Sequence, residues 1–235
     1  MKRKTFFKKI PSEEITPLEI YMRFLDDKNS YFFESVEGGE KWAKYSIIGL
    51  PTDKKIKLSD SPLDEIDDFM KSQKVERIEG LPDFTGGLVG YFSYDTIRHI
   101  EKKLSNSKKP QLNYAEISLM ISDELIVYDN YEKNLFIIVN DFEKNEKLAN
   151  SRIDEILQQI NTPLEDQENS KKNKIEFSSS VSKKDYLQNV KKIKDYILEG
   201  DVMQVVYGQE FSTNFEGSPM SLYKALRKLN PSPYM

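Results

Sequence analysis

The sequence of 235 residues contains no cysteine and a single histidine, His99. The lack of cysteine excludes disulfide bonds, thiol catalysis and cysteine-ligated zinc, and one histidine cannot build a multi-histidine metal site. Proteins without disulfides are typical of reducing compartments, so we expect a cytoplasmic protein. A lone histidine beside an arginine, as His99 stands beside Arg98, usually has a surface or packing role.

Long apolar runs and an excess of one charge are also absent. No run approaches the ~20 apolar residues of a membrane span, and the basic residues 1–4 are not followed by the apolar region of a signal peptide. We therefore expect no membrane partner. The net charge is −4 with both signs interspersed, which argues against nucleic acid as a partner. Hydrophobic residues make up 38% and charged residues 31%, a composition typical of one large or two small globular domains.

Helix starts give the clearest local signals. Thr16, Pro17 and Glu19 form the pattern of a capping box with proline at the first helical position. Residues 61–64 repeat the pattern with aspartate in place of glutamate. A further helix is expected to start at residue 182 and to end at Gly200, since glycine is common just after the last turn of a helix. We predict helices over 16–25, 61–70, 145–160, 182–200 and 218–229.

Strand signals occupy most of the remaining chain. Alternating, β-branched and aromatic segments predict strands over 31–35, 44–48, 55–58, 84–95, 117–129, 135–140, 174–180 and 202–212. Glycines in 84–95 suggest a bulge or a close backbone approach there. The polar segment 161–173 is typical of a linker. An antiparallel, strand-rich N-terminal region followed by alternating strands and helices predicts an α+β fold, with a domain boundary near residue 170.

The segment 33–49 holds the most informative pattern of the chain. Glu34 and Ser35 end an aromatic run, and Gly38 and Gly39 then precede the only tryptophan, Trp42, and a strand-like run. Two glycines between strands permit a tight reversal, which could turn the short polar groups toward a ligand. Spacing alone indicates an ordinary hairpin, with Trp42 as a packing residue.

This segment resembles the glutamate-serine motif near the start of the anthranilate synthase component I family. Residues 230–235, Asn-Pro-Ser-Pro-Tyr-Met, resemble the second half of the same feedback-inhibitor site; by themselves they read as a turn that ends a helix. The resemblance implies that Glu34, Ser35, Pro233, Tyr234 and Met235 bind L-tryptophan. An apolar, aromatic wall suits an indole ring, and a carboxylate could pair with the ammonium group.

Gln204 is the candidate catalytic residue. As a glutamine flanked by valines it is either a buried, hydrogen-bonded amide or a site group. Residues 200–209 resemble the start of the chorismate-binding region shared by chorismate-using enzymes. In relatives that add water, a lysine serves as general base at the position of Gln204. A glutamine at this position resembles the ammonia-using enzymes of the family. It argues against isochorismate and salicylate synthases, because ammonia is a better nucleophile than water and has less need of a general base.

The resemblance extends from about residue 15 to residue 235 and implies a specific architecture and activity. Residues 1–165 would be the N-terminal domain, 166–180 a linker and first strand, and 181–235 the incomplete beginning of a chorismate-binding α/β/β/α sandwich. The complete enzyme would convert chorismate and ammonia to anthranilate and pyruvate with Mg²⁺, whose ligands would lie outside this chain. A glutamine amidotransferase subunit, component II, would supply the ammonia.

The chain by itself is then expected to be an inactive fragment. Two alternatives remain open. One is component I of aminodeoxychorismate synthase, which Gln204 does not separate from anthranilate synthase. The other is a non-catalytic module that binds tryptophan or another protein.

Overall fold

The computed structural model describes residues 3–25, 29–36, 44–58, 61–73, 77–104, 114–141, 143–164 and 175–235. The chain forms two compact units, the first comprising 1–166 together with 229–235, and the second comprising 167–228. The assignment of 1–165, 166–180 and 181–235 to family domains stays a prediction. The glycine pair 38–39 and Trp42 lie outside the described residues. No helix within the described ranges is long and apolar enough to cross a bilayer.

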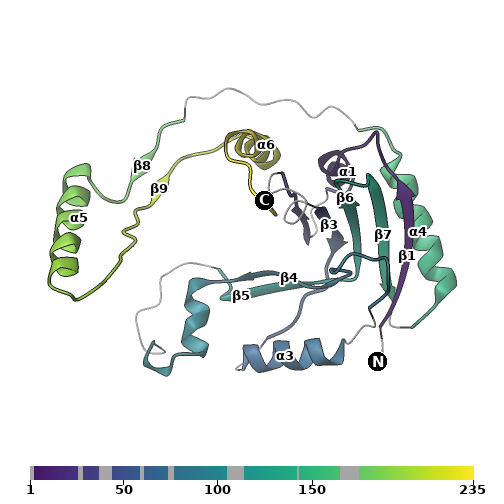
Figure 1. Ribbon diagram of the computed structural model, residues 1–235, viewed down its shortest axis with the longest axis horizontal. Coiled ribbons are helices and arrows are strands. Elements are labelled where there is room, and N and C mark those ends of the chain that lie inside the picture. Colours follow the sequence, from purple (N-terminus) through teal and green to yellow (C-terminus); the bar gives the residue numbers. More distant parts are fainter. Residues whose placement is uncertain are drawn as a thin grey trace. The chain divides into compact units, whose positions relative to one another are not determined.

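A five-stranded antiparallel sheet forms the centre of the first unit (Figure 1). Its order is β1 (Lys4–Pro11), β7 (Asn134–Asp141), β6 (Glu124–Asp129), β3 (Tyr45–Thr52) and β2 (Asn29–Phe33). A tight turn joins β6 to β7, in which Lys133 adopts a φ of 54° and the Asp129 carboxylate accepts the N–H groups of Tyr131 and Glu132. β6 and β7, which lie within the predicted strand segments 117–129 and 135–140, pair across this turn as a hairpin.

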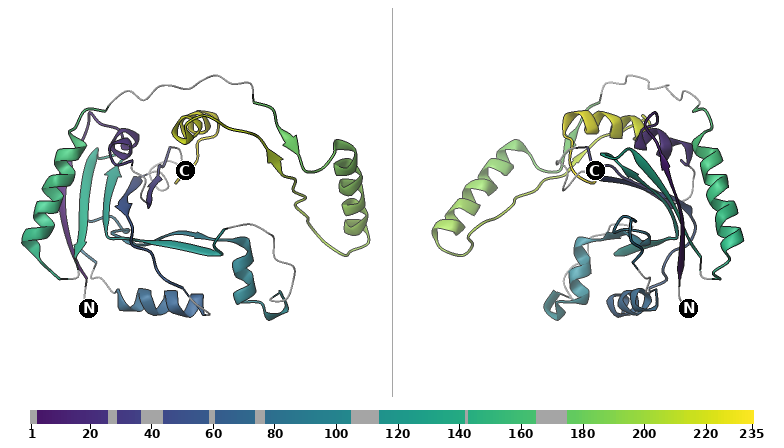
Figure 2. Two further views of the ribbon diagram at one scale, coloured as in Figure 1. Left: turned by 180° about the vertical axis from the view of Figure 1, so that it is seen from behind. Right: turned by 45° about the vertical axis from the view of Figure 1, so that its right-hand side comes forward.

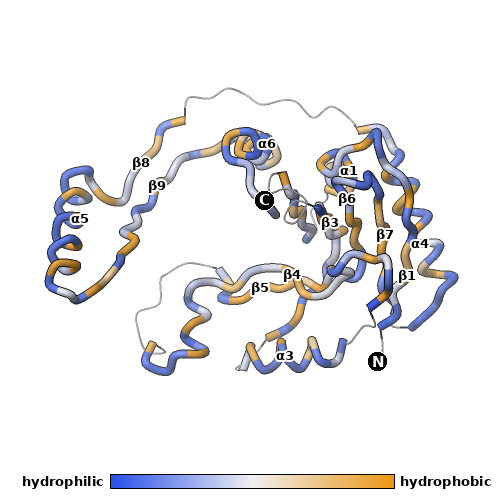
Figure 3. Tube along the Cα trace, viewed as in Figure 1, coloured by the Kyte–Doolittle hydropathy of each residue, from blue (hydrophilic) through white to orange (hydrophobic). Residues whose placement is uncertain are grey.

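Both faces of the central strands are buried. Ile126 and Ile137 contact the helices α1 (Pro17–Arg23) and α4 (Glu146–Ile160), which cover one face (Figure 2). Val127 and Phe136 point to the opposite face, where Leu81 and others pack against them. This explains why β6 and β7 are apolar along most of their length (Figure 3). The α+β class with antiparallel strands is confirmed.

The predicted helix starts are confirmed, with one difference in capping. Thr16 and Glu19 form the complete capping box at α1. Helix α3 (Pro62–Ser72) begins where predicted, but the Ser61 side chain makes no capping hydrogen bond. Ser61 has a ψ of 62°, outside the extended region that the capping residues Thr16 and Ser182 adopt.

The predicted strand 117–129 is wrong as a single element. It is divided at Asp123 into β5 (Ile117–Ser122), which pairs with β4 (Gly87–Phe92) in a two-stranded sheet, and β6 in the large sheet. Two 3-10 helices, Tyr94–His99 and Lys102–Leu104, follow β4. The predicted strand 55–58 is reduced to an isolated bridge between Lys55 and Met120. Gly90 lies directly against the main chain at Ser118, as the close approach predicted for this segment requires.

The second unit contains α5 (Lys183–Leu198), most of α6 (Pro219–Leu229) and the short strands β8 (Ser178–Ser179) and β9 (Phe211–Ser212). The helices begin as predicted, and Gly200, with a φ of 83°, ends the first of them. The long strands predicted over 174–180 and 202–212 are wrong, because only the two residues of each strand that pair with the other form a ladder. None of the residues 175–228 is buried.

Candidate functional site

The two separated motifs of the sequence meet in the first unit. The N–H of Glu34 donates to the carbonyl of Met235 and the N–H of Met235 donates to the carbonyl of Glu34, both at 2.8 Å. Glu34 directly follows β2, the last strand at one edge of the sheet. An edge strand exposes main-chain donors and acceptors that need partners, and Met235 supplies them at this point.

Side chains reinforce this backbone pairing. The N–H of Tyr234 points to the hydroxyl of Ser35 at 3.4 Å. Tyr234 adopts a φ of 51°, in the left-handed region that costs a residue with a Cβ about 1–2 kcal/mol. Backbone strain of this kind is retained where the surroundings fix the conformation, and it clusters at functional sites.

Glu34 and Ser35 lie in a buried position, with exposed fractions of 3% and 7%. Pro233 and Tyr234 are exposed, and Met235 is half-buried. The five residues predicted from the resemblance therefore combine a carboxylate, a hydroxyl and an apolar, aromatic surface. Such a set suits a small molecule that has an ammonium group and an aromatic body.

Ser46 and Asn130 lie behind Ser35, and sequence reasoning missed both. The hydroxyl of Ser46 accepts the N–H of Ser35 at 3.4 Å and a hydrogen bond from the Asn130 amide at 3.2 Å. Ser46 has no exposed surface and lies on β3 opposite Tyr128. A serine at an inward position of an otherwise apolar strand is the signal that could have found it, because a buried hydroxyl requires partners.

Gln204 lies in the second unit, exposed and in an irregular segment between α5 and β9. Its catalytic role stays a prediction. Within the described ranges, no three His, Asp or Glu side chains lie close enough together to hold a metal ion. We therefore assign no step to a metal on the described residues.

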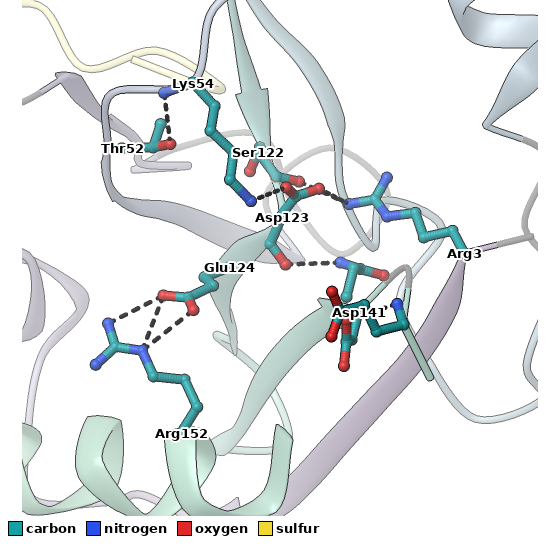
Figure 4. Close-up of polar contacts among 10 residues, drawn as sticks. Arg3, Thr52, Lys54, Ser122, Asp123, Glu124, Asp141 and Arg152 are labelled. Carbon is teal, nitrogen blue, oxygen red and sulfur yellow. Dashed lines mark hydrogen bonds and ion pairs between the residues drawn. The ribbon is translucent and has the colours of Figure 1, made fainter. Parts of the chain in front are cut away.

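A second polar cluster lies at Asp123, where the chain passes from the small sheet to the large one (Figure 4). The carboxylate is 3.1 Å from the Arg3 guanidinium and 2.8 Å from the Lys54 ammonium. Burial lowers the pKa of Arg3, and the neighbouring Asp123 opposes this effect. Burial also raises the pKa of Tyr31, whose hydroxyl is 2.8 Å from that of Ser122, to about 12.

The Asp123 cluster is best explained as a structural junction. The Asp123 carbonyl accepts both the N–H and the side-chain amide of Asn140 at 2.9 Å, so β7 is fixed to the same point. A second ion pair, between Glu124 and Arg152 at 3.0 Å, attaches α4 to the sheet (Figure 4).

Comparison with known proteins gives consistent matches along the chain. The model of a family described as chorismate binding enzyme matches residues 28–235. Anthranilate synthase component 1 of Pseudomonas aeruginosa is 39% identical over 251 aligned positions, which cover 94% of this chain and 50% of that protein. The proteins of the same name from Acinetobacter calcoaceticus and Acetivibrio thermocellus are 39% and 37% identical, over 94% of this chain in each case.

A solved structure gives the same match at the level of the fold. The crystal structure of anthranilate synthase component I from Streptococcus pneumoniae superimposes with a TM-score of 0.70 at 22% identity, and the match covers 96% of this chain and 53% of that chain. The chain spans about half the length of the curated relatives it matches.

Proposed function

Because the chain belongs to the family of chorismate binding enzymes, we propose that it is the N-terminal part of an anthranilate synthase component I. The complete enzyme converts chorismate and ammonia to anthranilate, pyruvate and water. Support comes from relatives of that name at 37–39% identity and from the two motifs of the sequence. Gln204, at the position where water-adding relatives carry a lysine, favours ammonia as the nucleophile.

We further propose that Glu34, Ser35, Pro233, Tyr234 and Met235 bind L-tryptophan as a feedback inhibitor. The reciprocal pairing of Glu34 with Met235 is the observation that carries this proposal, since it joins segments far apart in the sequence. The Glu34 carboxylate receives the ammonium group, and the surface formed by residues 233–235 receives the indole ring. Inhibition then follows if tryptophan binds a less active state more tightly than an active one.

We propose that catalysis requires protein segments that this chain does not contain. Residues 175–228 contain no buried side chain, so this described part of the second unit has no core that would hold a substrate site rigidly. The remaining half of the family's length, with Mg²⁺, is proposed to complete the chorismate site, and a glutamine amidotransferase subunit is proposed to deliver ammonia. The chain alone should form no anthranilate.

The reaction is tested with the native protein purified from its source cells. It is incubated with chorismate, ammonium and Mg²⁺, and the products are separated and identified by mass and fluorescence. Formation of anthranilate and pyruvate would support the proposal. Aminodeoxychorismate as product would assign the protein to the rival activity, and formation of isochorismate would contradict the role given to Gln204.

The inhibitor site is tested separately by calorimetric titration of the 235-residue chain. L-tryptophan should bind, whereas L-phenylalanine should bind weakly. Glu34→Gln should weaken L-tryptophan binding about 10-fold or more, because a hydrogen bond to a charged group contributes ~1.5–3 kcal/mol. Binding of indole-3-propionate, which lacks the ammonium group, should be unchanged by the same substitution. Equal losses for both ligands would refute the pairing of Glu34 with the ammonium group.

A further inference from the structure

The hydroxyl of Ser46 stands at the centre of a small network behind the proposed inhibitor site. It lies on β3, accepts the N–H of Ser35 at 3.4 Å and shares two contacts with the Asn130 amide, at 3.2 and 3.5 Å. The N–H of Asn130 in turn donates to the carbonyl of Lys44 at 2.8 Å. The network therefore connects the end of β2, the start of β3 and the turn after β6.

This network fixes the position of residues 34–36, which are not part of a β-strand. Glu34–Val36 follows β2 outside the regular ladder, so the main chain at Ser35 depends on other groups for its position. Its N–H goes to Ser46, and its hydroxyl is within 3.4 Å of the Tyr234 N–H. A shift of Ser46 would thus move the Ser35 hydroxyl away from the Tyr234 N–H.

We propose that Ser46, held by Asn130, is a positioning residue that sets the specificity and affinity of the inhibitor site. It has no exposed surface and acts only through Ser35. The inference rests on the proposed tryptophan site and deepens it: the hydroxyl of Ser35 is oriented toward the ligand and toward Tyr234 because its own N–H is anchored on Ser46.

The test is a double-mutant cycle on the 235-residue chain, with L-tryptophan affinity measured by calorimetry. Ser46→Ala should weaken binding about fivefold, the equivalent of losing one ordinary hydrogen bond of ~1 kcal/mol. Since Ser46 acts through Ser35, the same change should have almost no effect in a Ser35→Ala background. A purely structural role would instead give equal losses in both backgrounds, and that result would overturn the proposal.

A matched control separates positioning from general loss of stability. Ser122 is also a buried serine, 3% exposed, and its hydroxyl is 2.8 Å from that of Tyr31 at the Asp123 junction. Ser122→Ala should lower the melting temperature as Ser46→Ala does, but it should leave tryptophan affinity unchanged. A similar loss of affinity in both variants would overturn the proposal.

Two further arms keep the outcome decisive. If Ser46→Ala does not fold, Asn130→Ala is the substitute variant, because Asn130 is half-buried and its amide donates to the Ser46 hydroxyl. This variant should weaken L-tryptophan binding by a similar factor, and unchanged affinity would refute the positioning role. If the unmodified chain binds no L-tryptophan, the inhibitor site itself is refuted. If the unmodified chain binds L-tryptophan and Ser46→Ala binds it equally well, only the positioning role of Ser46 is refuted.

Discussion

Replacing Asp123 with alanine should destabilise the first unit severely. The substitution removes the counter-charge of Arg3, whose side chain is only 4% exposed, while the main-chain bonds from Asp123 to Asn140 remain possible. Breaking a buried ion pair by removal of one partner costs about 3–5 kcal/mol, because the remaining charge stays buried and loses its attraction to that partner. Lys54→Ala should cost at most ~1 kcal/mol, since the Lys54 side chain is 63% exposed.

The assay is hydrogen exchange of the Ile126 and Ile137 amides, because both residues are fully buried in the central strands and report on opening of this unit alone. Asp154→Ala is the matched control: Asp154 pairs with Lys8 at 2.9 Å, a similar distance, but both side chains are exposed. Adding Arg3→Met to Asp123→Ala should recover part of the loss. If Asp123→Ala and Asp154→Ala cost the same, the argument from burial is refuted.

Three further predictions concern local features of the first unit. Burial raises the pKa of Tyr31 from 10.0 to about 12. The contribution of the neutral phenol to the free energy of unfolding is therefore complete below pH 10 and is lost as the pH rises to 12. In urea unfolding at a series of pH values, Tyr31→Phe should reduce the decrease in stability between pH 10 and 12 by about 1.4 kcal/mol per pH unit. Gly90→Ala should lower the urea midpoint by the equivalent of about 1–3 kcal/mol, since its Cβ would overlap the main-chain oxygen of Ser118; an unchanged midpoint would show that this contact can relax. Thr16→Ala should cost about 1 kcal/mol at pH 7. The Thr16 hydrogen bonds lower the pKa of Glu19, so this cost should shrink below pH ~4; a cost independent of pH would contradict the role of the capping box.

Features set by neighbouring residues could be predicted from the sequence. The capping box at Thr16 and the helix start at residue 182 depend on side chains within three or four positions, and the structure contains both. The alternation of apolar residues likewise predicted most strands of the large sheet.

Features set by distant partners could not be predicted. The break at Asp123 depends on Arg3 and Lys54, which lie far away in the sequence, and apolar alternation continues across it. The segment 202–212 has the composition of a strand, but a strand requires a neighbour to pair with, and here only Phe211 and Ser212 have one.

The candidate site shows the same division. No local pattern links Glu34 to Met235; their association was expected only because the two motifs resemble a known family, and their roles as ligands stay predictions. Ser46 was missed because the run 44–48 was assigned by its apolar residues, although its one small polar side chain was the informative member.

The separation of Ser35 from Tyr234 by 199 positions has a consequence for the order of events during synthesis. All five strands of the large sheet are complete by residue 141, whereas at ribosomal speeds of about 5–20 residues per second the segment that pairs with Glu34 is made roughly 5–20 seconds later. During this interval the strands of the nascent sheet can pair, while the main-chain groups of Glu34 at its edge lack the partner that Met235 later supplies. Another extended chain could pair with this edge in the meantime. The proposed inhibitor site would thus be the last part of the first unit to form.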